Sequence, residues 1–158
     1  MKKNIVALVM LCSSVAALGT SAPAQAEMGK TTIGPSLNFG STGTTTVGID
    51  SKFGISDNLS LRPFIIFANF GGTIFGSALT YDFNVSRGEK FQIVPFAGAG
   101  ISIATANNFS STIGFLTAGA DFGITDSIEL KAAVKVPVFI GSESIGTPGF
   151  TLGAGFKF

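Results

Sequence analysis

Residues 128–140 read IELKAAVKVPVFI, and this stretch decides the fold. Its even positions are all apolar: Ile128, Leu130, Ala132, Val134, Val136, Val138 and Ile140. Its odd positions include Glu129, Lys131 and Lys135. Because side chains alternate between the two faces of a strand, the pattern predicts a strand with one apolar face and one charged face. A helix would mix the two sets around its circumference.

The first 26 residues are predicted to be a signal peptide. Lys2 and Lys3 make a basic start, residues 5–18 an apolar segment, and residues 24–26, Ala-Gln-Ala, a cleavage site. Cleavage there leaves one domain, residues 27–158. Cys12 is removed with the signal peptide, so the mature chain has no cysteine, and neither a disulfide framework nor a thiol site is expected.

The composition indicates a membrane protein that crosses with strands. Only 12% of the residues are charged, whereas soluble domains carry roughly 25%. After residue 26 no apolar run reaches the ~20 residues that a spanning helix needs. A hydrophobic exported chain without spanning helices is typical of a closed barrel in the outer membrane of a Gram-negative-type bacterium. The net charge of +1 gives no reason to expect a nucleic-acid partner.

Eight strands are predicted between clusters of turn residues. They cover residues 30–40, 44–55, 59–70, 73–85, 91–104, 112–124, 128–140 and 148–158. The turns between them fall at 41–43, 56–58, 71–72, 86–90, 105–111, 125–127 and 141–147. Each strand has about the length of a tilted membrane strand, ~9–11 residues.

The alternation of polar and apolar residues within these strands is the most specific signal in the sequence. Every charge well inside a predicted strand falls on the polar face and none on the apolar face, although the third strand is less clear because Arg62 shares its face with Phe64 and Ile66. These charged residues are Asp50, Lys52, Arg62, Asp82, Asp121, Glu129, Lys131, Lys135 and Lys157. The predicted fold is all-β, an eight-stranded antiparallel up-and-down transmembrane β-barrel whose interior holds these charges as a charge network or as the lining of a pore. A soluble lipocalin-like barrel, with the apolar face inside, is the alternative, but the polar face is too poor in charge for a soluble surface.

Three segments stand out beside the alternating strands: residues 94–100 (VPFAGAG), the hairpin around 125–127, and the final residues 153–158 (GAGFKF). With them the chain resembles small bacterial outer-membrane β-barrels of the OmpA transmembrane-domain, OmpX and OmpW type. The resemblance covers the whole predicted mature chain. It implies that Phe156 and Phe158 of the last strand are recognised by the outer-membrane assembly machinery. The short predicted outward turns depart from relatives that carry large loops.

The sequence offers little catalytic chemistry. It contains no histidine, which excludes a Ser-His dyad and a histidine metal site, so no catalytic residue, metal or cofactor is predicted and the protein is not expected to be an enzyme. The four acids and five bases inside the barrel are expected to pair with one another. Expected cross-strand neighbours are Asp121 with Lys131, and Arg62 with Asp82. Asp50 is expected diagonal to Arg62, and Lys157 beside Lys131 and near Glu129.

Two functions fit this interior. The favoured one is a structural or interaction element of the outer membrane, plugged inside and in contact with membrane lipid, because eight-stranded barrels usually fill their interior. The alternative is a narrow pore for water, ions or small solutes, lined by small residues such as Gly98 and Gly100. A soluble binding barrel is a more distant alternative. No part of the sequence indicates a ligand or a homo-oligomer.

Overall fold

The computed structural model describes residues 30–40, 43–68, 71–83, 86–88, 91–106, 109–138 and 146–158. These residues form β1 (Thr31–Phe39), β2 (Thr45–Ser56), β3 (Leu59–Phe67), β4 (Thr73–Asp82), β5 (Ser86–Gly88), β6 (Phe91–Ala106), β7 (Phe109–Gly123), β8 (Ile128–Val138) and β9 (Gly149–Lys157). The predicted signal peptide and its cleavage site lie outside the described residues. None of the described segments is a helix long and apolar enough to cross a bilayer.

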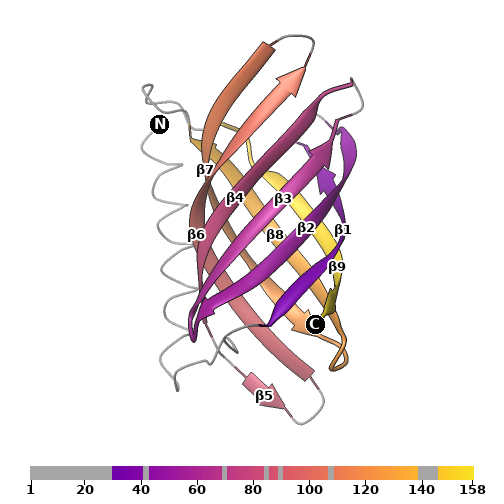
Figure 1. The fold of residues 1–158 in the computed structure, drawn as a ribbon, viewed down its shortest axis with the longest axis vertical. Helices are drawn as coiled ribbons and strands as arrows, with labels where there is room; N and C mark the ends of the chain where they lie inside the picture. Colours follow the sequence, from indigo (N-terminus) through magenta and orange to yellow (C-terminus); the bar gives the residue numbers. More distant parts are fainter. Residues whose placement is uncertain are drawn as a thin grey trace.

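Antiparallel pairing closes the sheet into a barrel (Figure 1). Each strand pairs with its neighbour in the chain, except that β4 pairs with β6, and β1 pairs with β9 to close the ring. The short β5 pairs only with the start of β6, so eight strands form the wall. The prediction of an eight-stranded up-and-down barrel is confirmed. We call the end where β1 begins and β9 finishes the terminal end, and the other end the loop end.

Two predicted turns are partly strand. Residues 86–88, expected in a turn, form β5 and pair with the start of β6, as in Gly88↔Phe91. The loop expected at 105–111 is also wrong, since β6 and β7 pair as far as Ala106↔Phe109. Thr105, Ser110 and Ser111 suit a strand as well as a turn, and in both segments a two-stranded ribbon satisfies the backbone hydrogen bonds outside the barrel wall. The hairpin signal was hidden because these residues also suit turns.

The apolar face of the wall points outward and the polar face inward. Inward positions are even-numbered on β1 to β4 and β6, and odd-numbered on β7 to β9. The buried polar and charged residues are Ser36, Asp50, Ser60, Arg62, Thr80, Asp82, Thr117, Asp121, Glu129 and Thr151. Large exposed hydrophobic residues are Ile33, Leu37, Val47, Ile49, Phe53, Ile55, Leu59, Leu61, Phe67, Phe75, Leu79, Tyr81, Ile101, Ile124, Ile128, Leu130, Phe150, Leu152, Phe156 and Phe158. The soluble-barrel alternative, which needed an apolar interior, is therefore wrong.

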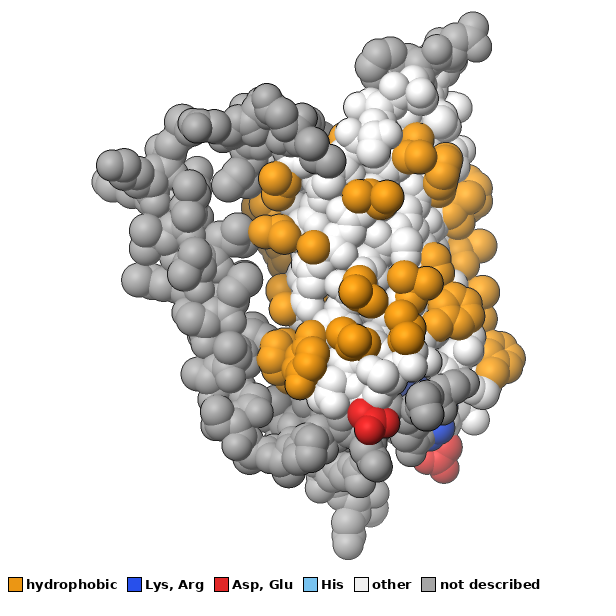
Figure 2. Space-filling model, turned by 60° about the vertical axis from the view of Figure 1, so that its left-hand side comes forward, with side chains coloured by type: hydrophobic (Ala, Val, Ile, Leu, Met, Phe, Trp, Pro, Cys, Tyr) orange, Lys and Arg blue, Asp and Glu red, His pale blue; other side chains and the backbone are white. Residues whose placement is uncertain are grey.

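Aromatic side chains mark both ends of this apolar exterior. Phe67, Phe75 and Phe150 are exposed near the loop end of their strands. Phe53, Tyr81, Phe156 and Phe158 are exposed near the terminal end. Figure 2 shows hydrophobic side chains over one face of the wall and acidic side chains at its lower end. Aromatic residues at two levels with aliphatic residues between them are the pattern of a wall that meets both interfaces of a bilayer.

The outward face predicts that the cost of a charged substitution depends on its depth in the bilayer. Leu152 lies in the middle of β9, whereas Ile128 is the first residue of β8, and both are exposed. Arginine at Leu152 should lower the free energy of unfolding in lipid vesicles by about 2–4 kcal/mol, and arginine at Ile128 by about 0–1 kcal/mol, because a charge costs most at the bilayer midplane. Denaturant titration of refolded L152R and I128R measures both values. Equal small losses would mean that no bilayer covers the wall.

Candidate functional site

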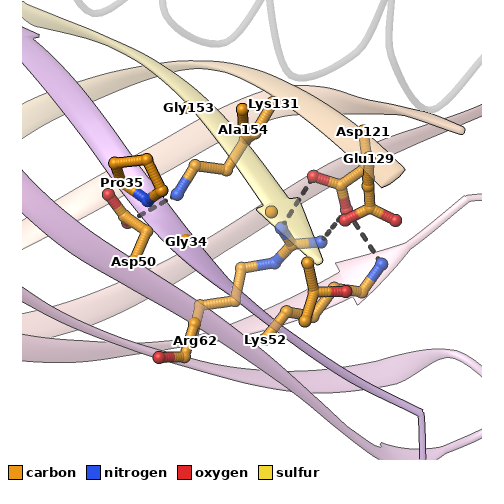
Figure 3. A pocket seen from close by; sticks show the side chains of 13 residues that line it. Gly34, Pro35, Asp50, Lys52, Arg62, Asp121, Glu129, Lys131, Gly153 and Ala154 are labelled. Carbon is orange, nitrogen blue, oxygen red and sulfur yellow. Dashed lines mark hydrogen bonds and ion pairs between the residues drawn. The ribbon is translucent and has the colours of Figure 1, made fainter. Parts of the chain in front are cut away.

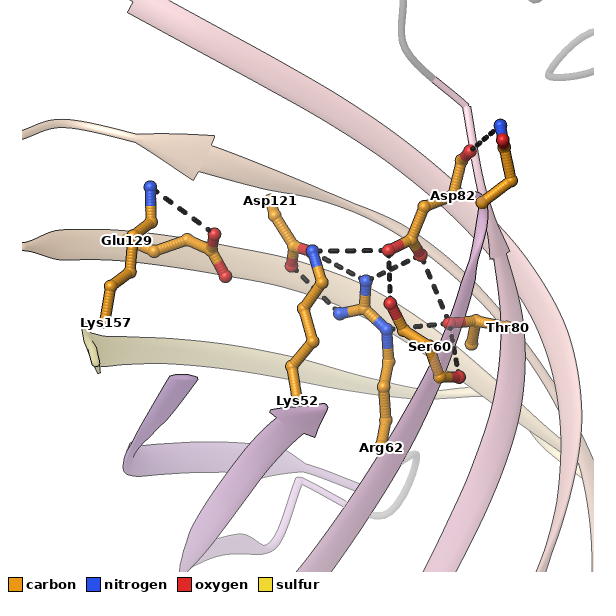
Figure 4. Close-up of polar contacts among 9 residues, drawn as sticks. Lys52, Ser60, Arg62, Thr80, Asp82, Asp121, Glu129 and Lys157 are labelled. Carbon is orange, nitrogen blue, oxygen red and sulfur yellow. Dashed lines mark hydrogen bonds and ion pairs between the residues drawn. The ribbon is translucent and has the colours of Figure 1, made fainter. Parts of the chain in front are cut away.

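Arg62 on β3 is the centre of the polar interior. Its Nη2 donates to Asp82 Oδ1 at 3.0 Å and to Asp121 Oδ2 at 2.7 Å, and its Nη1 donates to Asp121 Oδ1 at 3.0 Å. Its Nε donates to Thr80 Oγ1 at 2.9 Å. The guanidinium carbon also lies 3.6 Å from the centroid of the Phe96 ring. Every polar nitrogen of Arg62 therefore has a partner, and the side chain reaches from β3 to β7 on another part of the wall (Figure 4).

Lys52 completes a neutral cluster with Arg62 and the two aspartates. Its Nζ donates to Asp121 Oδ2 at 2.8 Å and lies 3.3 Å from Asp82 Oδ2. Ser60 Oγ donates to the same Asp82 oxygen at 2.6 Å. Two bases and two acids from β2, β3, β4 and β7 thus satisfy one another, which is the condition under which buried charges are tolerated. We call Lys52, Arg62, Asp82 and Asp121 the Arg62 cluster.

Two further ion pairs lie beside this cluster. Lys131 Nζ on β8 is 2.5 Å from Asp50 Oδ1 on β2, and this pair crosses the interior (Figure 3). Lys157 Nζ on β9 is 3.7 Å from Glu129 Oε2 on the adjacent β8. The four interior acids therefore each have at least one base within ion-pair distance.

Toward the loop end the interior is apolar on the side of β3, β4 and β7, whereas β1 and β9 contribute the buried polar residues Ser36 and Thr151. Phe64, Phe115, Ile66 and Ala78 form a buried cluster, and the Phe64 and Phe115 rings meet edge to face at 5.6 Å. Lys135 Nζ lies 3.5 Å from the Phe64 centroid and 5.9 Å from the Phe115 centroid. A buried ammonium over aromatic faces makes a cation–π contact. We call Phe64, Phe115, Ile66 and Ala78 the aromatic cap.

The expected cross-strand pairings are only partly right. Asp121 does lie opposite Lys131, but each makes its ion pair elsewhere, with Arg62 and Asp50 respectively. These partners sit across the interior, because a narrow barrel lets long side chains reach past their neighbouring strands.

Two other expected positions are wrong. Arg62 lies opposite Ala78 rather than Asp82, because β3 and β4 pair four residues out of the predicted register. The shift is even, so every side chain keeps its face, and Arg62 still reaches Asp82. Lys131 lies opposite Gly153 rather than beside Lys157, although Lys157 is near Glu129 as expected. Asp50, opposite Phe64, is diagonal to Arg62 as expected.

Three inward phenylalanines were not assigned to the site from the sequence, and each lies directly across from a glycine. The pairs are Phe64↔Gly76, Phe96↔Gly119 and Phe115↔Gly100. A methyl group on Gly76, Gly119 or Gly100 would lie 2.8, 2.8 or 2.6 Å from the tip of the facing ring. The glycines therefore make room for rings that fill the interior. The signal was present in the sequence, since each phenylalanine shares its parity with charged or small residues, but pairing it with a glycine requires the register.

The acidic side chains of the interior are not grouped as metal ligands in the part of the chain that the structure describes. Among the described residues, no three or more Asp, Glu, Cys or His side chains are placed to hold a metal ion. The interior arrangement instead neutralises buried charge and fills space.

The glycine–phenylalanine pairs generate a prediction. Gly119→Ala should lower the free energy of unfolding by about 1–3 kcal/mol, because the new methyl group meets the Phe96 ring and the β8 backbone. Gly153→Ala is the matched control, since its nearest atom, Pro35 O, is at an ordinary 3.4 Å, and its change should stay within about 0.5 kcal/mol. Denaturant titration in vesicles measures both. Equal effects at the two positions would show that glycine at 119 is not needed for space.

No protein-family model matches the chain, and no curated protein matches it. Solved structures do match. A de novo designed transmembrane β-barrel has a TM-score of 0.68 and 16% identity, covering 85% of this chain and 99% of that one. The N-terminal β-barrel domain of Pseudomonas aeruginosa OprF has a TM-score of 0.62 and 16% identity, covering 83% and 98%.

The outer membrane protein Ail of Yersinia pestis, in a phospholipid bilayer nanodisc, has a TM-score of 0.52 and 12% identity, covering 82% of this chain and 99% of Ail. All three likenesses span nearly the whole of the known chain, and at such low identities they concern the fold. The chain therefore has the fold of the small eight-stranded transmembrane β-barrels, as the resemblance in its sequence implied.

Proposed function

We propose that this protein is exported, loses residues 1–26 and inserts in the outer membrane as a closed structural or interaction element. The outward face supports the membrane part of this proposal. It exposes aliphatic residues between two levels of aromatic residues, an arrangement that is stable when lipid covers it and unfavourable in water. The basic start, the apolar segment and Ala24-Gln25-Ala26 support export.

The Arg62 cluster is the main support for the proposal that the interior is closed. Its ion pairs join β2 and β3 to β4 and β7 across the barrel, and its Asp82 and Asp121 are almost wholly buried. Phe96, also almost wholly buried, covers the guanidinium, and the aromatic cap adds buried apolar side chains from β3, β4 and β7 at the next level. Two successive layers, one charged and one aromatic, stand in the way of a solute.

The pore alternative needs continuous free space, and the cavities among these side chains are small. One, beside Asp50, Lys52 and Glu129, has a volume of ≈ 20 Å³, and another, beside Lys135, has ≈ 10 Å³. A single water molecule needs about 10–15 Å³ of such space. Of the glycines that suggested an open passage, Gly100 faces the Phe115 ring and Gly98 lies against the backbone of Leu79 and Thr80 on β4. These observations favour the closed barrel over the pore.

The last strand supports a proposal about assembly. Phe156 and Phe158 are exposed on the outside at the terminal end. Outward aromatic residues at the end of the final strand are what the family resemblance associates with recognition by the outer-membrane assembly machinery. We propose that contact for this chain, together with contact between the wall and membrane lipid. Neither role requires a cofactor or catalysis.

Planar-bilayer recording tests the closed interior. Refolded protein from residue 27 onward should insert and give no unit current steps, because the charged and aromatic layers block the barrel. A triple variant, R62A/D121A/F64A, removes part of both layers while keeping the charge balance, and should give steps. The matched control K157A/E129A removes a charge-balanced pair from the terminal end and should stay silent.

Other outcomes would change the assignment in specific ways. Wild-type steps whose size changes in R62A or K135A would make the barrel a pore and those residues its lining. Protein that stays monomeric in plain buffer and does not insert would remove the membrane assignment altogether.

A further inference from the structure

A cavity separates the Arg62 cluster from the aromatic cap. It is lined on its polar side by Asp50, Arg62, Thr117, Lys131 and Lys135. Its apolar lining comes from Phe64, Ala78, Phe96 and Ala133. The volume of ≈ 10 Å³ is about the space that one water molecule occupies.

Two buried polar atoms of this lining have no hydrogen-bond partner among the described residues: Lys135 Nζ and Asp50 Oδ2. Lys135 Nζ rests on the Phe64 ring, which leaves N–H groups without an acceptor. Asp50 uses its other oxygen, Oδ1, for the ion pair with Lys131. A buried donor and a buried acceptor that lack partners each cost about 1–3 kcal/mol, and more when charged.

The chemistry of these two atoms restricts what can lie between them. The occupant must accept a hydrogen bond from an ammonium group and donate one to a carboxylate oxygen. An anion would satisfy Lys135 but face the Asp50 carboxylate. A metal cation would satisfy Asp50 but face Lys135 and Lys131. An organic molecule exceeds the available volume. Only a neutral group of one heavy atom that both donates and accepts meets all these conditions.

We propose that this cavity is a binding site for one water molecule, which accepts from Lys135 Nζ and donates to Asp50 Oδ2. The water gives both orphan groups a partner, as buried waters typically do. The water also explains how four interior acids provide hydrogen-bond acceptors for five bases. Asp50 holds Lys131 directly through Oδ1 and Lys135 through the water on Oδ2, so the fifth base needs no acid of its own.

A crystal structure grown in bromide, at a resolution that shows ordered waters, tests the site. The expected result is a density peak within hydrogen-bond distance of both Lys135 Nζ and Asp50 Oδ2, with no anomalous signal. An anomalous bromide peak there would overturn the proposal in favour of an anion site. Direct contact between Lys135 Nζ and Asp50 Oδ2, with nothing between them, would also overturn it.

A variant tests whether Lys135 holds the water. Lys135→Met keeps an unbranched side chain about as long as the carbon part of lysine and removes the donor, so the peak should be lost. Lys157→Met removes a base that does not line the cavity and should leave the peak in place. A peak that persists in K135M would show that the other lining groups hold the water. If K135M does not refold, the bromide experiment on the wild-type protein decides alone.

Discussion

The hydrogen bonds and ion pairs of the Arg62 guanidinium are the interactions on which the rest of the interior depends. A charge enclosed by a barrel wall loses its hydration, and only well-placed partners make up for that loss. The guanidinium provides five donors in a planar fork. Arg62 Nη2 donates to both Asp82 and Asp121, and Nε donates to Thr80. Lys52 also contacts both aspartates, but through a single nitrogen, so it cannot hold both oxygens of Asp121 and Thr80 at once as the planar fork of Arg62 does. The Arg62 cluster thus ties together strands that are not neighbours in the wall.

The position of Arg62 depends in turn on the glycines of the opposite wall. The guanidinium lies on the Phe96 ring, and that ring lies over Gly119 on β7. A larger residue at Gly119 would move the ring, and the ring would move the charge that rests on it. The same relation holds for Phe64 with Gly76 and Phe115 with Gly100. Alternating large and small residues across adjacent strands fills a narrow interior at close packing, which is the shape requirement of an eight-stranded barrel.

The sequence predicts which residues lie inside much better than which residues touch. Alternation fixes the face of a side chain, and a register shift of an even number of residues leaves that face unchanged. Arg62 therefore lies inside even though the β3–β4 register differs from the predicted one by four residues. Its contact with Asp121, 59 residues away in sequence, depends on barrel closure and on the reach of a long side chain. Neither follows from spacing along the chain. Phe96 was overlooked because a ring among inward glycines contradicts the rule that polar residues line the interior.

Lys131 and Lys135 show how the opposite wall decides the environment of a charge. They lie four residues apart on the same face of β8. Lys131 meets a carboxylate, Asp50, whereas Lys135 meets the rings of Phe64 and Phe115. Asp50 and Phe64 are themselves directly opposite on β2 and β3, so the border between the charged and the aromatic layer passes between two paired residues. A desolvated cation–π contact is worth about 2 kcal/mol, less than burying an ammonium costs. Lys135 therefore needs a further partner to stay charged, and the acceptor in the lining of its cavity that also lacks one is Asp50 Oδ2.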